Sequence, residues 1–287
     1  MFQLQYIGKQ SKIMNKKLKI AVISSKGGVG KSTVSMQLIL PYLFEKNDFI
    51  PINHYEFDDE NNDSSSFGAS SLSIRRQISV SSPLLREELA EIFAKDESIC
   101  LDIGANKTTM TLIEALNDSA MINFLDLVVI PLLDGEQDSI NASFIYSVLK
   151  GYNPKLKFAF VLNRVRDAKH VKHQFENYFG DVRGIFKNIN AVTDNIFDED
   201  KDNYILMMDH DIVKYSRRFG LTIYEIAKQK KDFIEALKDS ISSTLQEKEV
   251  KLLSFKNYVS KSANSYEKDV INIAFKKIDK ILGEDNE

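Results

Sequence analysis

Short apolar runs rich in Ile and Val recur along the chain, separated by stretches in which apolar residues return at helical spacing. Nearly continuous apolar character is typical of strands that are buried on both faces of a parallel sheet. The pattern predicts strands at 19–25, 50–57, 98–103, 125–131 and 157–162, and a last strand within 203–208. It predicts helices at 32–44, 83–94, 108–116 and 139–149, the first of them disturbed at Pro41. This alternation indicates an α/β fold with a doubly wound, mostly parallel sheet that carries helices on both faces.

The last part of the chain has a different pattern. No proline or glycine interrupts 231–282, and the apolar residues of 270–282 form one stripe of a helix, with lysines largely opposite. The sequence therefore predicts an N-terminal extension at 1–16, a main domain at 17–244 and a helical C-terminal extension at 245–287. The stripe suits packing on the sheet or on a partner helix better than lying on a membrane, because the acidic residues after it oppose anionic lipid.

Composition narrows the class of protein. With 43% hydrophobic residues and a net charge of −3, the chain is too apolar and too nearly neutral for a disordered protein. The one cysteine, Cys100, excludes an internal disulfide and a four-cysteine zinc site, and its apolar neighbours indicate a buried thiol in the reducing cytosol. No charge-free stretch reaches the length of about 18 residues that spans a membrane, and the polar start is too short for a secretory leader. We therefore expect a soluble, cytoplasmic protein.

The most specific motif is Gly-Gly-Val-Gly-Lys-Ser-Thr at 27–33, which follows the first predicted strand and opens a helix. Glycines let backbone N–H groups curl around phosphate oxygens, and the positive end of the helix adds to the attraction. In such a loop Lys31 reaches the β and γ phosphates, and the Ser32 hydroxyl joins the ligands of Mg²⁺. The motif predicts that a nucleotide with Mg²⁺ is bound by Gly27, Gly28, Val29, Gly30, Lys31, Ser32 and Thr33.

Lys26 stands where the general phosphate-loop pattern has glycine. With this lysine the chain resembles the deviant Walker ATPases, the family of the ParA plasmid and chromosome partition proteins and MinD. The resemblance implies a P-loop NTPase fold with ATP as the nucleotide. It also implies a homodimer that forms on ATP, in which Lys26 binds the phosphates held by the partner subunit and takes part in catalysis.

The segment Glu-Phe-Asp at 56–58 lies where this family carries the acid that positions the attacking water. The resemblance implies this role for Asp58. Glu56 stands where the family usually has Asp, and Asp-Glu at 59–60 replaces a common Pro-Gln, so the surrounding loop departs from the family pattern. A solvated acidic loop over 58–63 is the alternative interpretation.

Two other predicted strands end in polar residues. Asp102, near the end of the strand at 98–103, matches the Walker B aspartate that holds Mg²⁺ through water, although a turn cap is the alternative. Gly104 and Ala105 then occupy the place where a small residue lets the backbone approach the γ phosphate. Asn163 follows the strand at 157–162, and the resemblance implies that its carboxamide reads adenine, since this group can donate and accept hydrogen bonds. An ordinary turn residue is the alternative for Asn163.

These residues imply a slow ATP hydrolase. Phosphoryl transfer to water depends on positioning and charge neutralisation more than on covalent chemistry. Lys31 and the partner's Lys26 would stabilise the charge of the γ phosphate, with Mg²⁺ held by Ser32 and Asp102, while Asp58 orients the water. No arginine finger is evident in the sequence, so we expect a partner protein to stimulate hydrolysis.

Basic residues gather late in the chain. Lys and Arg outnumber Asp and Glu between 214 and 261, and Arg217 and Arg218 form the core of one cluster. Such an excess predicts nonspecific contacts with DNA phosphates, and a solvated helix surface is the alternative. His170 and His173 lie one helical turn apart, but without a third ligand an exposed helix face is the preferred interpretation.

Two functions fit these expectations. The first is a ParA-like ATPase of a bacterial cytoplasm, associated with the nucleoid, that partitions plasmid or chromosomal DNA and is stimulated by a centromere-binding protein or another activator. The alternative is a MinD-like ATPase that binds the membrane through its C-terminal helix and positions division or another cellular machine. An electron-donating relative of nitrogenase iron protein is excluded, because it needs two cluster cysteines per subunit and this chain has only Cys100.

Overall fold

The fold is built on a sheet of seven parallel strands in the order β3-β2-β4-β1-β5-β6-β7. The computed structural model describes residues 17–57, 63–104, 107–180, 197, 200–229 and 247–284. The strands are β1 (Lys19–Ile23), β2 (Ile52–Phe57), β3 (Ser73–Gln77), β4 (Ile99–Ile103), β5 (Leu127–Leu132), β6 (Phe158–Val165) and β7 (Tyr204–Met208). The predicted α/β fold is confirmed, and the strand order, which the sequence pattern left open, places β1 between β4 and β5.

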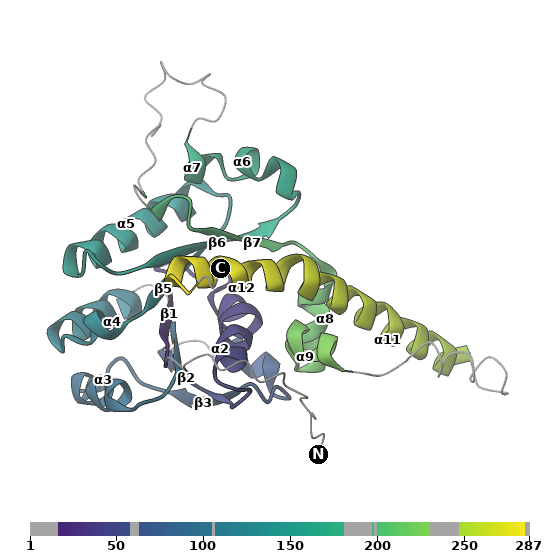
Figure 1. Ribbon diagram of the computed structural model, residues 1–287, viewed down its shortest axis with the longest axis horizontal. Coiled ribbons are helices and arrows are strands. Elements are labelled where there is room, and N and C mark those ends of the chain that lie inside the picture. The colour runs from purple at the N-terminus through teal and green to yellow at the C-terminus, as the bar shows by residue number, and fades with distance from the viewer. Residues whose placement is uncertain are drawn as a thin grey trace.

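Helices cover both faces of this sheet (Figure 1). Successive side chains of a strand point to opposite faces, so Ile20 and Val22 join one buried cluster while Ala21 and Ile23 join the other. Helices α2, α9 and α12 contribute to the first cluster, and α3, α4 and α5 contribute to the second. The helices are α1 (Lys31–Val34), α2 (Leu40–Lys46), α3 (Leu85–Ala94), α4 (Lys107–Asp118), α5 (Glu136–Tyr152), α6 (Val171–Gln174), α7 (Glu176–Phe179), α8 (Asp211–Phe219), α9 (Ile223–Lys228), α11 (Glu247–Tyr266) and α12 (Asn272–Leu282).

The helix that follows the glycine-rich loop continues past Pro41. Proline has no N–H group, so Pro41 cannot donate to the carbonyl of Gln37 four residues earlier. The backbone takes a wider π-helical form over Ser35–Ile39, and α2 then runs on to Lys46. Pro41 therefore disturbs the helix, as the sequence indicates, without ending it.

The pattern of apolar residues did not predict β3, α8 or α9. Strand β3 pairs with β2 alone at the edge of the sheet and has no fully buried residue, so it needs no apolar run. Helices α8 and α9 are short and are marked by their caps. His210 Nδ1 accepts a hydrogen bond from the Ile212 N–H at the start of α8, Gly220 ends that helix with a φ of 68°, and Thr222 forms a capping box with Glu225 at the start of α9.

The C-terminal helices belong to the core. Helix α11 continues through a π-helical turn, Glu267–Ile271, into α12, and together they form the long yellow rod of Figure 1. Ala274, Phe275 and Ile278 of the predicted apolar stripe are buried in the same cluster as β1. This confirms the expected packing of the stripe. No helix among the described residues is long and apolar enough to cross a membrane, and 231–246 lies outside those residues.

Candidate functional site

A cleft of about 690 Å³ lies at the carboxyl ends of the strands, where the glycine-rich loop meets four segments that are distant in the sequence. The chain passes from β1 to β2 on one side of the sheet and from β5, the neighbour of β1, to β6 on the other side, and the crevice at such a point is the usual ligand site of a parallel sheet. The cleft is lined by Gly27, Gly28, Gly30, Lys31, Ser32, Thr33, Glu56, Asp102, Gly104, Asn163, Arg164, Met208, Asp209, His210, Asp211, Val213, Lys214, Arg217 and Arg218.

The loop itself has the backbone that its glycines predict. Gly28 has a φ of 79° and Gly30 a φ of 94°, both in the region that other residues rarely adopt. Gly30 also leaves no room for a side chain, because an added Cβ would lie 2.1 Å from Asn163 Nδ2. That nitrogen donates a hydrogen bond of 2.9 Å to the carbonyl of Val29. The loop is therefore held from β6, and the N-terminus of α1 opens into the cleft.

Asp102 lines the cleft from β4, the strand beside β1. Burial raises the pKa of its carboxyl to about 7, although the Lys31 ammonium opposes this rise. The carboxyl of Glu56 raises the pKa further, and the hydroxyls of Ser35 and Ser32 lower it by hydrogen bonding. Lys31, Ser32 and Asp102 of the sequence prediction are thus brought together.

This grouping fits Mg²⁺ only together with a phosphate ligand. No three of the His, Cys, Asp and Glu side chains in the described part of the chain could hold a metal ion by themselves. Mg²⁺ characteristically uses one or two protein ligands and takes the remaining oxygens from phosphates and water. A hydroxyl at Ser32 and a carboxylate at Asp102 are ligands of this kind, and Asp102 ionises more readily when a cation is near.

Lys26 lies outside the cleft lining and pairs within its own chain. Its Nζ is 2.9 Å from Oδ1 of Asp138, which lies in the first turn of α5. The side chain of Asp138 is 4% exposed and that of Lys26 is 39% exposed. Sequence reasoning missed Asp138, because only the fold brings the start of α5 next to the loop.

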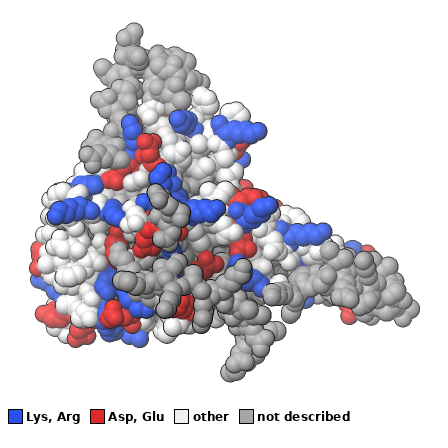
Figure 2. Space-filling model, in the orientation of Figure 1, with Lys and Arg blue, Asp and Glu red and all other residues white. Residues whose placement is uncertain are grey.

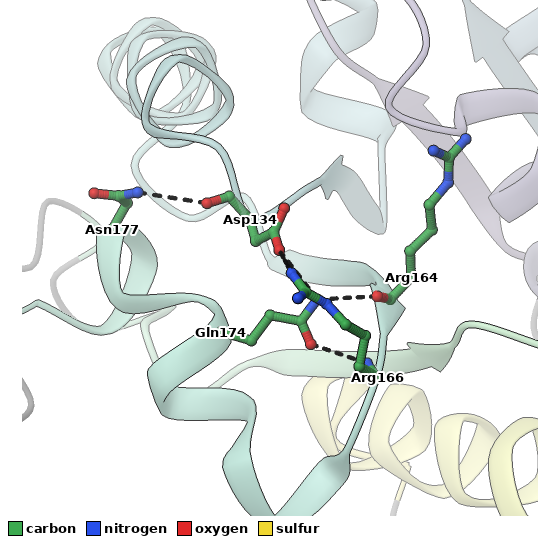
Figure 3. A network of polar contacts seen from close by, with 5 residues as sticks. All are labelled: Asp134, Arg164, Arg166, Gln174 and Asn177. Atoms are coloured by element: carbon green, nitrogen blue, oxygen red, sulfur yellow. Dashed lines mark hydrogen bonds and ion pairs between the residues drawn. The ribbon is translucent and has the colours of Figure 1, made fainter.

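Both polar atoms of the Asn163 carboxamide form hydrogen bonds within the protein. Its Nδ2 holds Val29, and its Oδ1 accepts from the N–H of Arg164, which has a φ of 58°. Gln174 supports this turn, since its side chain donates to the Arg164 carbonyl and accepts from the Arg166 N–H (Figure 3). Figure 3 also shows the Arg164 guanidinium pointing away from this network. The reading of adenine by Asn163 stays a prediction.

The Arg166 side chain adds an ion pair with Asp134 to this network. Its Nη2 pairs with Asp134 Oδ2, which also accepts from Gln174 Nε2, while Asn177 donates to the Asp134 carbonyl (Figure 3). These contacts join the loop after β5 to the turn after β6. They therefore fix the β6 side of the cleft, where Arg164 is a lining residue.

The basic residues Arg217 and Arg218, which the sequence associates with DNA, line the cleft together with Lys214. Arg217 donates a hydrogen bond from Nη2 to Oγ1 of Thr33, at the end of the glycine-rich loop. These arginines lie on α8, whose caps were a signal in the sequence for the helix. No signal in the sequence indicated that the arginine side chains point into the cleft. On the face seen in Figure 2, basic and acidic side chains are interspersed.

Two predicted residues fall outside the part of the chain that the structure describes. These are Asp58 and Ala105. Glu56, two residues before Asp58, lines the cleft, and Gly104, one residue before Ala105, does so as well. The carboxyl ends of β2 and β4 therefore both lead towards the cleft.

Comparisons with known proteins give structural similarity at low identity. No protein-family model matches the chain, and no curated protein matches it. The cell division protein MinD of Aquifex aeolicus is 15% identical, with 80% of this chain and 99% of that chain covered and a TM-score of 0.47. A putative plasmid partition protein from Borrelia burgdorferi B31, bound to AMPPNP, is 16% identical over 79% of this chain and 98% of that chain, with a TM-score of 0.47. The complex of a Cyanothece McdA variant with ATP is 11% identical over 80% of this chain and 98% of that chain, with a TM-score of 0.42.

Proposed function

We propose that the chain is a Mg²⁺-dependent ATPase of the ParA and MinD kind. The observation that carries this proposal is the loop of residues 26–33, with left-handed Gly28 and Gly30, opening α1 into the cleft beside Asp102. Backbone N–H groups at a helix N-terminus, a buried lysine and a neighbouring carboxylate are the parts that bind a nucleoside triphosphate. The lysine at 26 distinguishes this loop from the general pattern.

The protein residues act by holding and neutralising the phosphates. The N–H groups of 27–33 bind phosphate oxygens, and Lys31 places its ammonium near the β and γ phosphates. Ser32 and Asp102 hold Mg²⁺, which neutralises charge on the γ phosphate when bound. Asp58, which follows β2, orients the attacking water. These contributions are mostly electrostatic, so a slow reaction that an activator protein accelerates is the expected behaviour.

Dimerisation on ATP requires Lys26 to change its partner. In the single chain this lysine is paired with Asp138 at 2.9 Å. The lysine is partly exposed, but the Asp138 carboxylate is 4% exposed, so the exchange leaves a buried carboxylate without its cation and has a cost that nucleotide binding must offset. Exchange of Asp138 for the phosphates of a second copy would link nucleotide binding to assembly of the homodimer.

For the biological role we favour partition of plasmid or chromosomal DNA, with nonspecific DNA binding by the dimer and a centromere-binding protein or another activator as partner. A nucleoid-associated, cytoplasmic location follows from this role. The MinD-like alternative requires an apolar surface that can enter a membrane. The stripe of α12 is buried against the sheet, with Phe275 and Ile278 in the core, and this disfavours α12 as the anchor.

The test combines ATP hydrolysis with retention on duplex DNA and on anionic liposomes. We expect the wild type to hydrolyse ATP with Mg²⁺, Lys31→Ala to abolish hydrolysis, and Lys155→Ala, an exposed lysine outside the cleft, to leave it unchanged. Asp58→Ala should bind ATP without hydrolysing it and should be retained on DNA as a dimer, more weakly as salt rises.

Absence of ATP binding by the wild type would refute the proposed ATPase. ATP-dependent retention on liposomes and not on DNA would replace the partition role with the membrane role. Retention on DNA that is the same with and without ATP would refute the nucleotide-dependent switch.

A further inference from the structure

Helix α8 brings a group of basic side chains to the cleft. Lys214, Arg217 and Arg218 line it, and Arg164 lines it from β6. Within the described ranges none of these four side chains forms an ion pair, although Asp209 and Asp211 line the same cleft. Ammonium and guanidinium groups that are not engaged in ion pairs favour the binding of an anion close to them, even though Glu56 and Asp102 also line the cleft and weaken its net positive field.

Arg217 is the one of these residues that touches the phosphate loop. Its Nη2 donates to Oγ1 of Thr33, and its guanidinium carbon lies 5.9 Å from the ring centre of Phe67. Thr33 and Phe67 are both buried, so one bond and one aromatic face orient the guanidinium. The other N–H groups of Arg217 have no hydrogen-bond partner in the part of the chain that the structure describes. They remain free to bind a ligand in the cleft.

The helix that carries Arg217 is fastened to the loop helix. Ser216, the preceding residue, is buried and accepts a hydrogen bond of 2.7 Å from Gln37 Nε2. Gln37 Oε1 accepts a bond of 2.7 Å from the N–H of Ile223 at the start of α9. Because one side chain of the loop helix holds both α8 and α9, the backbone of Arg217 has a fixed place relative to the phosphate loop.

The contact identifies the part of the nucleotide that Arg217 would meet. Thr33 lies on the β6 side of the loop, since the Cβ position of Gly30 is 3.8 Å from Thr33 Cβ and 2.1 Å from Asn163 Nδ2. Under the proposed function Lys31 and Asp102 lie at the β and γ phosphates, which leaves the lining residues of β6 and β7 to border the rest of the nucleotide. The phosphate nearest to Thr33 is therefore the one that joins the ribose.

We propose that Arg217 is a nucleotide-binding residue supplied within the same chain, whose guanidinium binds the α phosphate of ATP and of ADP. This inference rests on the proposed function, because it needs a nucleotide in the cleft. It assigns Arg217 to nucleotide binding in place of the DNA contact that the sequence indicated. Arginine is suited to this role because its planar donors can hold Thr33 and a phosphate oxygen together.

The test is the affinity of ATP and of ADP, each with Mg²⁺, measured by isothermal titration calorimetry on the full chain. A lost hydrogen bond to a charged group predicts that Arg217→Gln weakens both nucleotides by the same factor, about 10- to 100-fold. Arg217→Lys keeps the charge and should lose less. Arg86→Gln, which removes an exposed arginine paired with Asp118, is the matched control and should bind as the wild type does.

The outcomes separate this inference from the proposed function. If the wild type binds neither nucleotide, the proposed function fails. If Lys31→Ala abolishes binding while Arg217→Gln and Arg217→Lys bind as the wild type does, the proposed function stands and this inference is overturned. A loss for ATP alone would overturn the placement at the α phosphate.

Two controls complete the design. Thermal unfolding without ligand is monitored by far-UV circular dichroism. Equal melting temperatures of wild type and Arg217→Gln would show that the loss of affinity comes from a direct contact. If Arg217→Gln unfolds, Arg217→Lys is the test: weaker binding of both ATP and ADP supports the inference, and binding equal to that of the wild type overturns it. Loss of DNA retention by Arg217→Gln at saturating ATP, with nucleotide affinity unchanged, would assign the arginine to DNA and overturn the inference.

Discussion

Replacing Gly30 with alanine tests whether Asn163 holds the glycine-rich loop of residues 26–33 in its observed conformation. The substitution has two separate costs. Alanine at a φ of 94° adopts a backbone conformation that costs about 1–3 kcal/mol. The new Cβ would also lie 2.1 Å from Asn163 Nδ2, which is too close for any contact, so the carboxamide must move. Moving it breaks the buried bond to the Val29 carbonyl and costs about 1–3 kcal/mol more.

The two costs can be separated by a double-mutant cycle. In an Asn163→Ala background the carboxamide is absent, so Gly30→Ala should cost only the backbone strain. We expect the double variant to be less destabilised than the sum of the two single variants, by about 1–3 kcal/mol. Equilibrium unfolding in urea, followed by far-UV circular dichroism because the chain has no tryptophan, measures each free energy.

The matched control is Gly27→Ala in the same loop. An added Cβ at Gly27 meets nothing within 4 Å, and its φ lies outside the positive range. We expect this change to alter the free energy of unfolding by less than about 1 kcal/mol. Additive effects of Gly30→Ala and Asn163→Ala, or an equal cost at Gly27, would refute the idea that Asn163 limits the space above Gly30.

Two further predictions concern the core and a buried histidine. Ile278→Ala in α12 should lower the free energy of unfolding by about 2–5 kcal/mol, because this side chain is 0% exposed. The control Ile273→Ala, at a side chain that is 61% exposed, should lower it by under about 0.5 kcal/mol. Equal urea midpoints for the two variants would show that α12 is dispensable to the core. Burial, assisted by Arg75, lowers the pKa of His54 to about 3, against the opposing carboxylates of Glu56 and Asp102, which lie 3.5 and 3.9 Å from its ring nitrogens. The unfolded chain therefore binds a proton below about pH 6.5 that the folded chain does not, and this contribution to stability is lost as the pH falls. The stability of His54→Leu relative to wild type should therefore rise by about 1.4 kcal/mol per pH unit between pH 6 and pH 4 in urea unfolding, and a constant difference would mean that His54 is protonated in the fold.

The loop at 26–33 illustrates what local sequence determines. Its glycines are required by backbone geometry at Gly28 and Gly30, and its position after an apolar run predicted strand, loop and helix without any knowledge of distant residues. The buried strands were equally evident, because burial on both faces demands apolar residues throughout. Asp102 was identifiable for the same reason, as a charged residue within such a run.

Other parts of the site depend on contacts between distant segments, to which no local pattern corresponds. Asp138 becomes the partner of Lys26 only when α5 starts beside the loop, and Arg217 reaches Thr33 only because α8 follows β7 at the same edge of the sheet. Strand β3 has no apolar run because it lies at an edge of the sheet, and helices α8 and α9 are so short that their caps mark them more clearly than their apolar spacing does.

The sequence by itself thus determined the parallel α/β fold and the conformation of the glycine-rich loop, because both follow from the chemistry of neighbouring residues. Only the tertiary structure decided which charged side chains face that loop. Arg217 and Arg218 read as a surface cluster in the sequence, yet they line the cleft, because the direction of a side chain depends on where its helix packs. The apolar stripe of α12 likewise became part of the core only because the helix packs against the sheet.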